Sequence, residues 1–301
     1  MNAGEATERN VLVSFFRRGV SDRIIYLLVA SALLLPLIFE VRLPPAPMQA
    51  GDDTFKTIDA LAPAPGKIVI LAADFGPGTT GENQPMAELV MEHLFRKRVP
   101  FAMMSIYVQA SPMLRELPLK VAARLQKENP GQSWEYGKDW VNLGFQANGA
   151  LSLQSFAKAE DIHQVQPTDA NGTPLGEIPV MQNVRTVRDV RLLVEITGLV
   201  GVFNTWLQFF RTEGYSPPML HGCTSISIPD AYIYYSSKQI LGFFEGIAGA
   251  AWYDKRMSDQ FPGRSDVANR VNTGLAFAQL VILALIVLGN IGYVVTKSRP
   301  T

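Results

Sequence analysis

The sequence predicts an α/β domain of the Rossmann-like three-layer type with a parallel sheet, flanked by an N-terminal and a C-terminal transmembrane helix. Two observations predict this architecture. Apolar segments without a charge lie near both ends of the 301-residue chain. Between them, runs of β-branched and aliphatic residues alternate with amphipathic stretches, which is typical of buried strands joined by helices.

The composition excludes several classes of protein. Lys plus Arg and Asp plus Glu both number 27, so a general nucleic-acid binder, which needs a basic excess, is excluded. A single cysteine excludes an internal disulfide framework and a cysteine-based zinc site. Charged residues make up 18% of the chain, against roughly 25% in soluble domains, which indicates a membrane protein.

The first transmembrane helix is expected at 24–43, after a cytoplasmic or interfacial segment at 1–23. Its apolar run, IIYLLVASALLLPLIF, rises about 24 Å and reaches across a core of about 30 Å if Arg23 and Arg42 extend to the interfaces. A secretory signal peptide is the alternative. A cleavage site at Met48-Gln49-Ala50 would place methionine where a small side chain is needed, so we expect an uncleaved anchor.

The second transmembrane helix is expected at 271–296, which holds 26 residues without a charge, between a linker at 257–270 and a tail at 297–301. At 1.5 Å per residue it reaches about 39 Å and can span with tilt. The two apolar segments predict a two-pass protein of the inner membrane. Because arginines concentrate before the first span, the positive-inside rule predicts its orientation. Both termini are expected in the cytoplasm and the central domain on the extracytoplasmic side.

Residues 44–66 contain five prolines and are expected to form an extended spacer. The α/β domain is expected at 67–256. Strands are predicted at 67–76, 99–108, 140–145, 189–198 and 219–228, and helices at 84–98, 112–128, 150–158, 200–212 and 236–256.

The first strand ends at an acidic residue followed by a glycine-rich turn. In parallel sheets ligands bind beyond the carboxyl ends of the strands, and a turn before a helix can bind anions through its amides. The candidate ligand-binding residues are therefore Asp74, Gly76, Gly78, Thr79, Thr80 and Gly81. The glycine spacing does not match a dinucleotide or phosphate-loop motif, so no cofactor is predicted. An ordinary loop, whose glycines permit positive φ, is the alternative.

His221, Cys223 and Asp230 lie close together in the sequence, and a thiol beside an imidazole can act as a nucleophile pair. The alternative is a buried cysteine and a histidine at a strand end. His93 and His163 have no partners at metal-ligand spacing. The sequence therefore predicts no catalytic residue and no metal site, and a non-enzymatic protein is favoured over an enzyme.

Small residues recur at four-residue spacing in the predicted helix 236–256. Gly242, Gly246 and Ala250, with Gly249 beside them, would line one helix face and let another backbone come close. This face is expected to pack either on the sheet of its own domain or against another subunit.

The chain resembles a poorly characterised group of bacterial membrane proteins. The similar stretches are the turn ending in QPMAE, PTDANGTPLGEIPVM (167–181), SSKQILGFFEGIAGAAWYDK (236–255) and LGNI (288–291). The resemblance implies two membrane anchors around a Rossmann-like domain in the cell envelope, and it implies no activity.

Three hypotheses of function follow. The first is a non-enzymatic, membrane-anchored docking subunit of a larger membrane assembly, with lipid and other subunits, identical or different, as partners. The second is a membrane-tethered ligand-binding or sensing domain that uses the turn 74–83. The third is a hydrolase or transferase that uses Asp74. A pocket with convergent polar groups at the strand ends would favour the second or third, and a filled edge with exposed apolar side chains would favour the first.

Overall fold

The computed structural model describes residues 21–297 of the chain. It divides into two compact units, one formed by the residues up to Pro44 together with those from Asn269, and one formed by Pro45–Ala268. The predictions for the N-terminal interfacial segment before residue 21 and for the last four residues of the tail lie outside the described residues.

The larger unit contains a six-stranded sheet in the order β3-β2-β1-β4-β5-β6, and every neighbouring pair of strands is parallel. The strands are β1 (Ile68–Asp74), β2 (Phe101–Ser105), β3 (Trp140–Phe145), β4 (Val190–Thr197), β5 (Met219–Cys223) and β6 (Gly242–Glu245). The predicted α/β fold with a parallel sheet is confirmed. The strand order reverses between β1 and β4, which makes their carboxyl ends the topological switch point.

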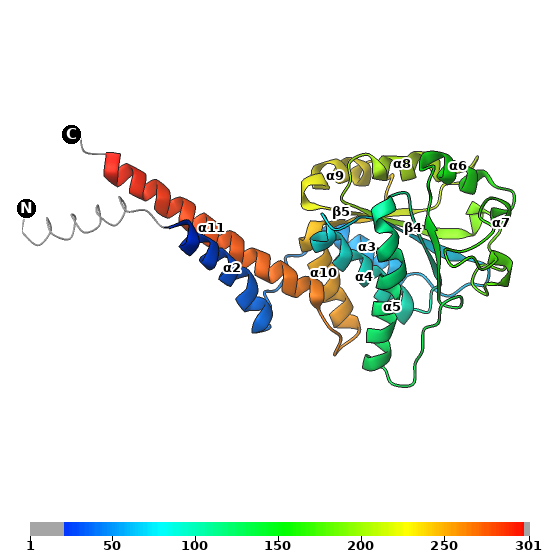
Figure 1. Ribbon diagram of the computed structural model, residues 1–301, viewed down its shortest axis with the longest axis horizontal. Helices are drawn as coiled ribbons and strands as arrows, with labels where there is room; N and C mark the ends of the chain where they lie inside the picture. Colours follow the sequence, from blue (N-terminus) through cyan, green and yellow to red (C-terminus); the bar gives the residue numbers. More distant parts are fainter. Residues whose placement is uncertain (1–20, 298–301) are drawn as a thin grey trace, which may run out of the picture. The chain divides into compact units, whose positions relative to one another are not determined.

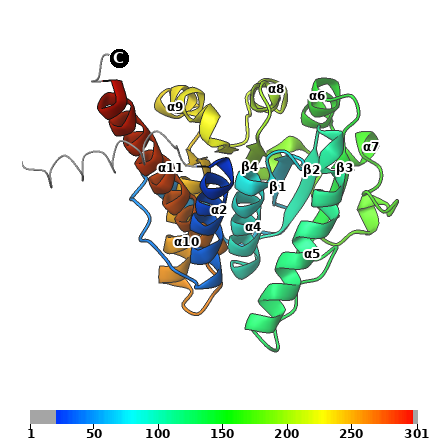
Figure 2. The same cartoon turned by 60° about the vertical axis from the view of Figure 1, so that its left-hand side comes forward.

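Helices cover both faces of this sheet and complete three layers (Figure 2). One face carries α4 (Thr80–Arg96), α5 (Ser111–Glu128) and α10 (Gly246–Gln260), and the other carries α6 (Ala150–Lys158), α8 (Val202–Phe209) and α9 (Ile228–Ser236) (Figure 1). The helix α7 (Ile162–Val165) follows α6, and short 3-10 turns lie at Val108–Ala110, Leu175–Glu177, Val187–Asp189 and Ser225–Ser227.

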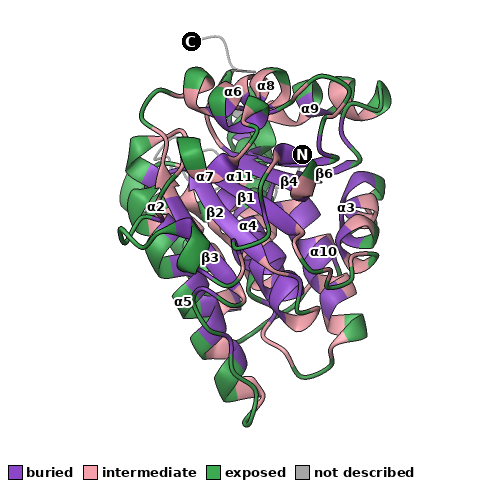
Figure 3. Ribbon diagram, turned by 90° about the vertical axis from the view of Figure 1, so that its right-hand side faces the viewer, coloured by how far each residue is buried: buried purple, intermediate pink, exposed green. Residues whose placement is uncertain are grey.

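Strands β1, β2 and β4 are buried on both faces apart from Arg191, as their largely apolar sequences predict (Figure 3). All seven residues of β1 are buried. The core beneath α6, α8 and α9 contains the large rings of Trp206, Phe210 and Phe243, each at most 1% exposed. This packing fixes α8 over the carboxyl half of the sheet, where the candidate site lies.

The expectation of an extended spacer over 44–66 is wrong for its middle, which forms helix α3 (Gln49–Asp59). The prolines lie on either side of this helix. They limit its length and leave the backbone hydrogen bonds of its interior intact. Ala50, Phe55 and Ile58 are buried because α3 packs along the edge strand β6 and against α10. The α/β unit therefore begins before residue 67.

The expectation of one continuous helix over 236–256 is also wrong. Residues Gly242–Glu245 form the edge strand β6, and α10 begins only at Gly246, whose φ of +61° breaks the regular backbone. Phe243 and Phe244 face opposite sides of the sheet and both are fully buried, a burial that a strand permits and a one-sided helix does not. Helix α9, just before this segment, was not predicted.

The smaller unit consists of α2 (Asp22–Ile38) and α11 (Val267–Lys297), which lies mostly within it. By length and composition α11 is apolar enough over Val267–Val294 to cross a membrane, and its large side chains are mainly exposed. The two helices contact each other: a Cβ at Gly274 would lie 2.9 Å from the carbonyl oxygen of Leu33. Glycine thus permits a close backbone approach in this pair.

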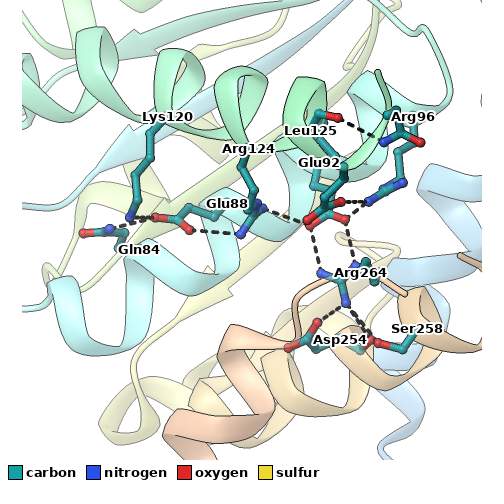
Figure 4. Close-up of polar contacts among 12 residues, drawn as sticks. Gln84, Glu88, Glu92, Arg96, Lys120, Arg124, Leu125, Asp254, Ser258 and Arg264 are labelled. Atoms are coloured by element: carbon teal, nitrogen blue, oxygen red, sulfur yellow. Dashed lines mark hydrogen bonds and ion pairs between the residues drawn. The ribbon is translucent and has the colours of Figure 1, made fainter. Parts of the chain in front are cut away.

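A buried cluster of charges ties together α4, α5, α10 and the loop that follows α10 (Figure 4). The Arg264 guanidinium donates from Nε and Nη2 to the two oxygens of Glu92, at 2.7 and 2.8 Å, and from Nη1 to Asp254. The side chains of all three residues are at most 2% exposed. Arg96 and Arg124 complete the surroundings of Glu92. We call this set the Arg264 cluster.

Candidate functional site at the carboxyl ends of the strands

Asp74, the last residue of β1, is fully buried beneath α8. Its Oδ1 accepts hydrogen bonds from the Ser105 hydroxyl at 2.6 Å and from the Ile106 amide at 2.7 Å. Its Oδ2 accepts one from Trp206 Nε1 at 2.6 Å. These three donors come from the end of β2 and from α8, so the carboxyl group links the neighbouring strand to the helix layer above the sheet.

Burial raises the pKa of Asp74 to about 7, and the nearby carboxyl group of Glu195 acts in the same direction. The donors Ser105, Ile106 and Trp206 favour the ionised form and oppose the shift. A carboxyl group with this pKa resembles a general acid or base electronically. Its position is unlike that of a catalytic acid or base, because the Asp74 side chain has no exposed surface and cannot reach a substrate.

The glycine-rich turn after Asp74 lies against the loop that follows β4. A Cβ at Gly198 would fall 2.4 Å from the Thr79 methyl group, so the Thr79 side chain already fills the space between the two loops at the switch point. Gly78 and Gly81 face open space, and Gly76 lies against Tyr107 and Gln109. Thr80 begins α4. The predicted ligand-binding residues are neighbours in the fold, but the Asp74 carboxyl group does not face the turn's open side.

Two residues of adjacent strands form a buried pair that the sequence analysis did not identify as a pair. Glu195 on β4 is aligned with His221 on β5, and its Oε2 lies 2.7 Å from His221 Nδ1. Burial raises the pKa of Glu195 well above its usual range. The signal was present in the sequence: Glu195 interrupts the otherwise apolar end of the strand VRLLVEIT. A charged residue inside a buried strand needs a partner.

The His221 ring lines a cavity of about 160 Å³ between α8, α9 and the ends of β4 and β5. Phe203 covers the imidazole with its ring centroid 4.2 Å away. Cys223 lines the same cavity, and its Sγ donates to the Phe244 carbonyl at 3.4 Å. The structure therefore brings His221, Cys223 and Asp230 to one cavity, yet the imidazole is engaged with Glu195 and the thiol with the main chain.

The other two histidines have local partners. His93 is fully buried; its Nδ1 lies 2.6 Å from the Tyr253 hydroxyl, and burial lowers its pKa to about 4. His163 Nε2 lies 3.1 Å from the Met181 carbonyl oxygen. Within residues 21–297 no group of three His, Cys, Asp or Glu side chains is arranged to hold a metal ion.

The small residues predicted to form a packing face are buried inside the larger unit, on two different elements. A Cβ at Gly242 on β6 would lie 2.6 Å from the Thr54 amide nitrogen of α3. A Cβ added at Gly246 would lie 2.4 Å from Ser225 Oγ, and one added at Gly249 would lie 3.1 Å from the Phe244 carbonyl carbon. These residues, with the buried Ala250, let α3 and α10 approach the edge of their own sheet.

Comparison of the chain with protein-family models, curated proteins and solved structures finds no match in any of the three.

Replacing Asp74 by asparagine is expected to lower the free energy of unfolding by about 1–3 kcal/mol, because an amide NH₂ must face either Trp206 Nε1–H or the Ile106 amide. The pKa of Asp74 is raised in the folded protein, so the carboxyl group's contribution is complete below pH about 4 and is lost as pH rises through about 7. The free energy of unfolding of the wild type should therefore exceed that of the variant by more at pH 5 than at pH 8.

Chemical denaturation of both proteins at the two pH values measures this difference. Asp259→Asn is the control, because the Asp259 side chain is 58% exposed in its ion pair with Lys255. It should change the stability by less than about 1 kcal/mol. Equal effects of the two substitutions would contradict the structural role of Asp74.

Proposed function

We propose that this protein is a non-enzymatic, membrane-anchored docking subunit of a larger membrane assembly. The observation that carries the proposal is a set of exposed aliphatic side chains at the carboxyl edge of the sheet. One lies after each of β2, β3, β4 and β5: Val108 (59% exposed), Leu151 (68%), Val200 (100%) and Ile226 (87%). We call these four residues the aliphatic rim.

The aliphatic rim lies where an α/β enzyme carries polar groups that contact its substrate. Single exposed aliphatic residues are common on protein surfaces, but their recurrence in the connections after four strands at one edge favours contact with another apolar surface. Burying Val200 or Ile226 on a partner is worth about 1.5–3 kcal/mol for each side chain. The occupant that we infer is an apolar surface of another membrane-protein subunit.

The two alternatives have less support at the residues that they use, the turn 74–83 and Asp74; the polar cavity at the ends of β4 and β5 lies apart from both. A ligand-binding role of the turn 74–83 requires room at the switch point, which Thr79 fills. A hydrolase or transferase that uses Asp74 requires access to a carboxyl group whose exposed surface is 0%. Neither requirement agrees with the packing around β1.

The anchoring part of the proposal is a two-pass topology in the inner membrane, with α2 and α11 as the spans, both termini in the cytoplasm and the α/β unit outside it. The apolar, exposed surface of α11 supports one span. The exposed side chains of Tyr26 (71%), Leu27 (67%) and Ile38 (68%) on α2 support the second. Arg23 in the first turn of α2 supports the orientation.

Fusions to a reporter enzyme that is active only outside the cytoplasm test this topology. A fusion after residue 150 is expected to be active and one after Thr301 inactive, because the basic flank retains the N-terminus in the cytoplasm and two spans return the chain to it. Activity at Thr301 would contradict a second span or the proposed orientation. A fusion at residue 150 that stays inactive would contradict the extracytoplasmic placement.

The docking role is tested with the double variant Val200→Asp/Ile226→Asp. Two buried carboxylates are incompatible with an apolar contact, so the affinity for the partner should fall by at least about 100-fold. Native mass spectrometry of protein gently solubilised from its own membranes should show an assembly for the wild type and the single chain for the variant. The masses separate further copies of this chain from different subunits.

Leu119→Asp is the matched control, because Leu119 is 51% exposed on α5 and does not belong to the aliphatic rim. It should leave the assembly intact. A wild type that is a single chain, or a control that dissociates the assembly as strongly as the double variant, would contradict the proposal.

A further inference from the structure

The cavity beside His221 is small and partly enclosed. Its volume of about 160 Å³ is below the roughly 300–1,000 Å³ of sites for drug-sized ligands. It corresponds to about five water molecules at their liquid volume of about 30 Å³ each. A ligand in it has only a few non-hydrogen atoms.

The polar floor of the cavity is the His221 imidazole, which is 3% exposed. Glu195 holds Nδ1 and Phe203 covers the ring, so the imidazole has a fixed orientation. Its other nitrogen, Nε2, has no hydrogen-bond partner in the part of the chain that the structure describes. A nearly buried nitrogen without a partner on a cavity wall is a group that a ligand can satisfy.

The Glu195–His221 pair determines what Nε2 offers. Glu195 is fully buried, and its Oε1 has no partner among the described residues, so a net negative charge on the pair is costly. In a neutral pair with a proton between Glu195 Oε2 and Nδ1, the second proton lies on Nε2, whichever residue carries the shared one. A proton on Oε1 instead would leave a buried hydroxyl without an acceptor. Nε2 therefore presents an N–H to the cavity.

A second donor comes from Asn204 in the first turn of α8. Its Oδ1 accepts the Tyr234 hydroxyl at 2.8 Å, which leaves its Nδ2 group as the donor. Two other polar wall residues are already engaged: the Thr197 hydroxyl donates to the Asp74 carbonyl, and the Cys223 thiol donates to the Phe244 carbonyl. The cavity thus combines two nitrogen donors.

The remaining walls are mostly apolar and carry no positive charge among the described lining residues. Leu199, Val200, Ala231 and Ile233 supply aliphatic surface, and no lysine or arginine lines the cavity. The exposed carboxylate of Asp230 disfavours an anion, and the two N–H donors on His221 and Asn204 offer an ammonium group no acceptor. We propose that this cavity binds a small uncharged molecule whose carbonyl oxygen accepts hydrogen bonds from His221 and Asn204 and whose short aliphatic body contacts the apolar walls.

Three small probes with the same isopropyl group and different polar groups test the site: isobutyramide, isobutyrate and isobutylamine. Saturation-transfer NMR on the full-length protein in detergent measures their affinities. Isobutyramide should bind saturably and more tightly than the other two. Equal binding of the charged probes, or no saturable binding of the amide, would overturn the proposal.

The variant Asn204→Leu should weaken isobutyramide binding about fivefold or more, the effect of removing one hydrogen bond. His221→Phe should weaken isobutyramide binding further. If His221→Phe unfolds because Glu195 loses its partner, the Asn204→Leu variant still decides the test. Asn148→Leu is the matched control, because Asn148 lines a separate cavity of about 320 Å³. Equal affinities of wild type and Asn204→Leu, or equal losses in Asn204→Leu and Asn148→Leu, would overturn the proposal.

Discussion

Replacing Arg264 by methionine is expected to lower the free energy of unfolding of the α/β unit by about 3 kcal/mol. The substitution removes the guanidinium that bonds both Glu92 and Asp254 and keeps a long apolar side chain in its place (Figure 4). Removing one partner of a buried ion pair leaves the other charge without compensation, at a cost of about 3–5 kcal/mol. The expected value is at the low end, since Arg96 and Arg124 still contact Glu92.

The pH dependence provides a second readout. Burial raises the pKa of Glu92, but the hydrogen bonds and charges of Arg264, Arg124 and Arg96 outweigh it and hold that pKa below its usual value. A lowered pKa contributes stability above the unfolded-state value of about 4.3, and the contribution is lost as pH falls through the folded-state value. The difference between wild type and Arg264→Met should therefore shrink when denaturation is measured below pH 4.

Lys120→Met is the matched control in the same region. Lys120 donates to Glu88 at 2.8 Å from a side chain that is 61% exposed, so solvent screens the pair. The expected loss is less than about 1 kcal/mol. If Arg264→Met costs no more than Lys120→Met, the Arg264 cluster does not stabilise the fold.

Gly242→Ala is expected to destabilise the α/β unit by about 1–3 kcal/mol, although it adds only one methyl group. The new Cβ would lie 2.6 Å from the Thr54 amide nitrogen and 2.9 Å from the Ala50 carbonyl oxygen, both on the backbone of α3. A backbone cannot rotate out of the way as a side chain can, so α3 must move from the edge strand. A thermal melt should show a lower transition temperature.

Gly78→Ala is the control for this prediction, because no atom lies within 4 Å of the position of its added Cβ. Its melting temperature should stay close to that of the wild type. Gel filtration beside the melt separates packing inside one chain from packing between chains. An oligomer that dissociates while the monomer's melting temperature is unchanged would show that Gly242 lies at a subunit contact.

The sequence by itself predicted the features that depend on local patterns. The unbroken aliphatic run of β1 and the alternation of strands with amphipathic stretches indicate a parallel sheet, because strands covered on both faces must be apolar throughout. The uncharged segment at 271–296 indicates the long apolar helix α11, because its length and composition do not depend on any contact. Asp74 was identified as a candidate because the local sequence alone places it at the end of the first buried strand.

Tertiary structure alone decided the features that depend on a distant neighbour. The segment at Gly242 has a helical spacing of small residues, but α3, nearly 200 residues earlier in the chain, lies where only a glycine of strand β6 leaves room. Asp74 has the residue type of a ligand-binding group, but Ser105 and Trp206 occupy its carboxyl oxygens. Glu195 and His221 lie 26 positions apart, and only the register of β4 with β5 brings them together. Local patterns determine which residues can be buried, whereas the contacts made on folding determine what each buried group meets.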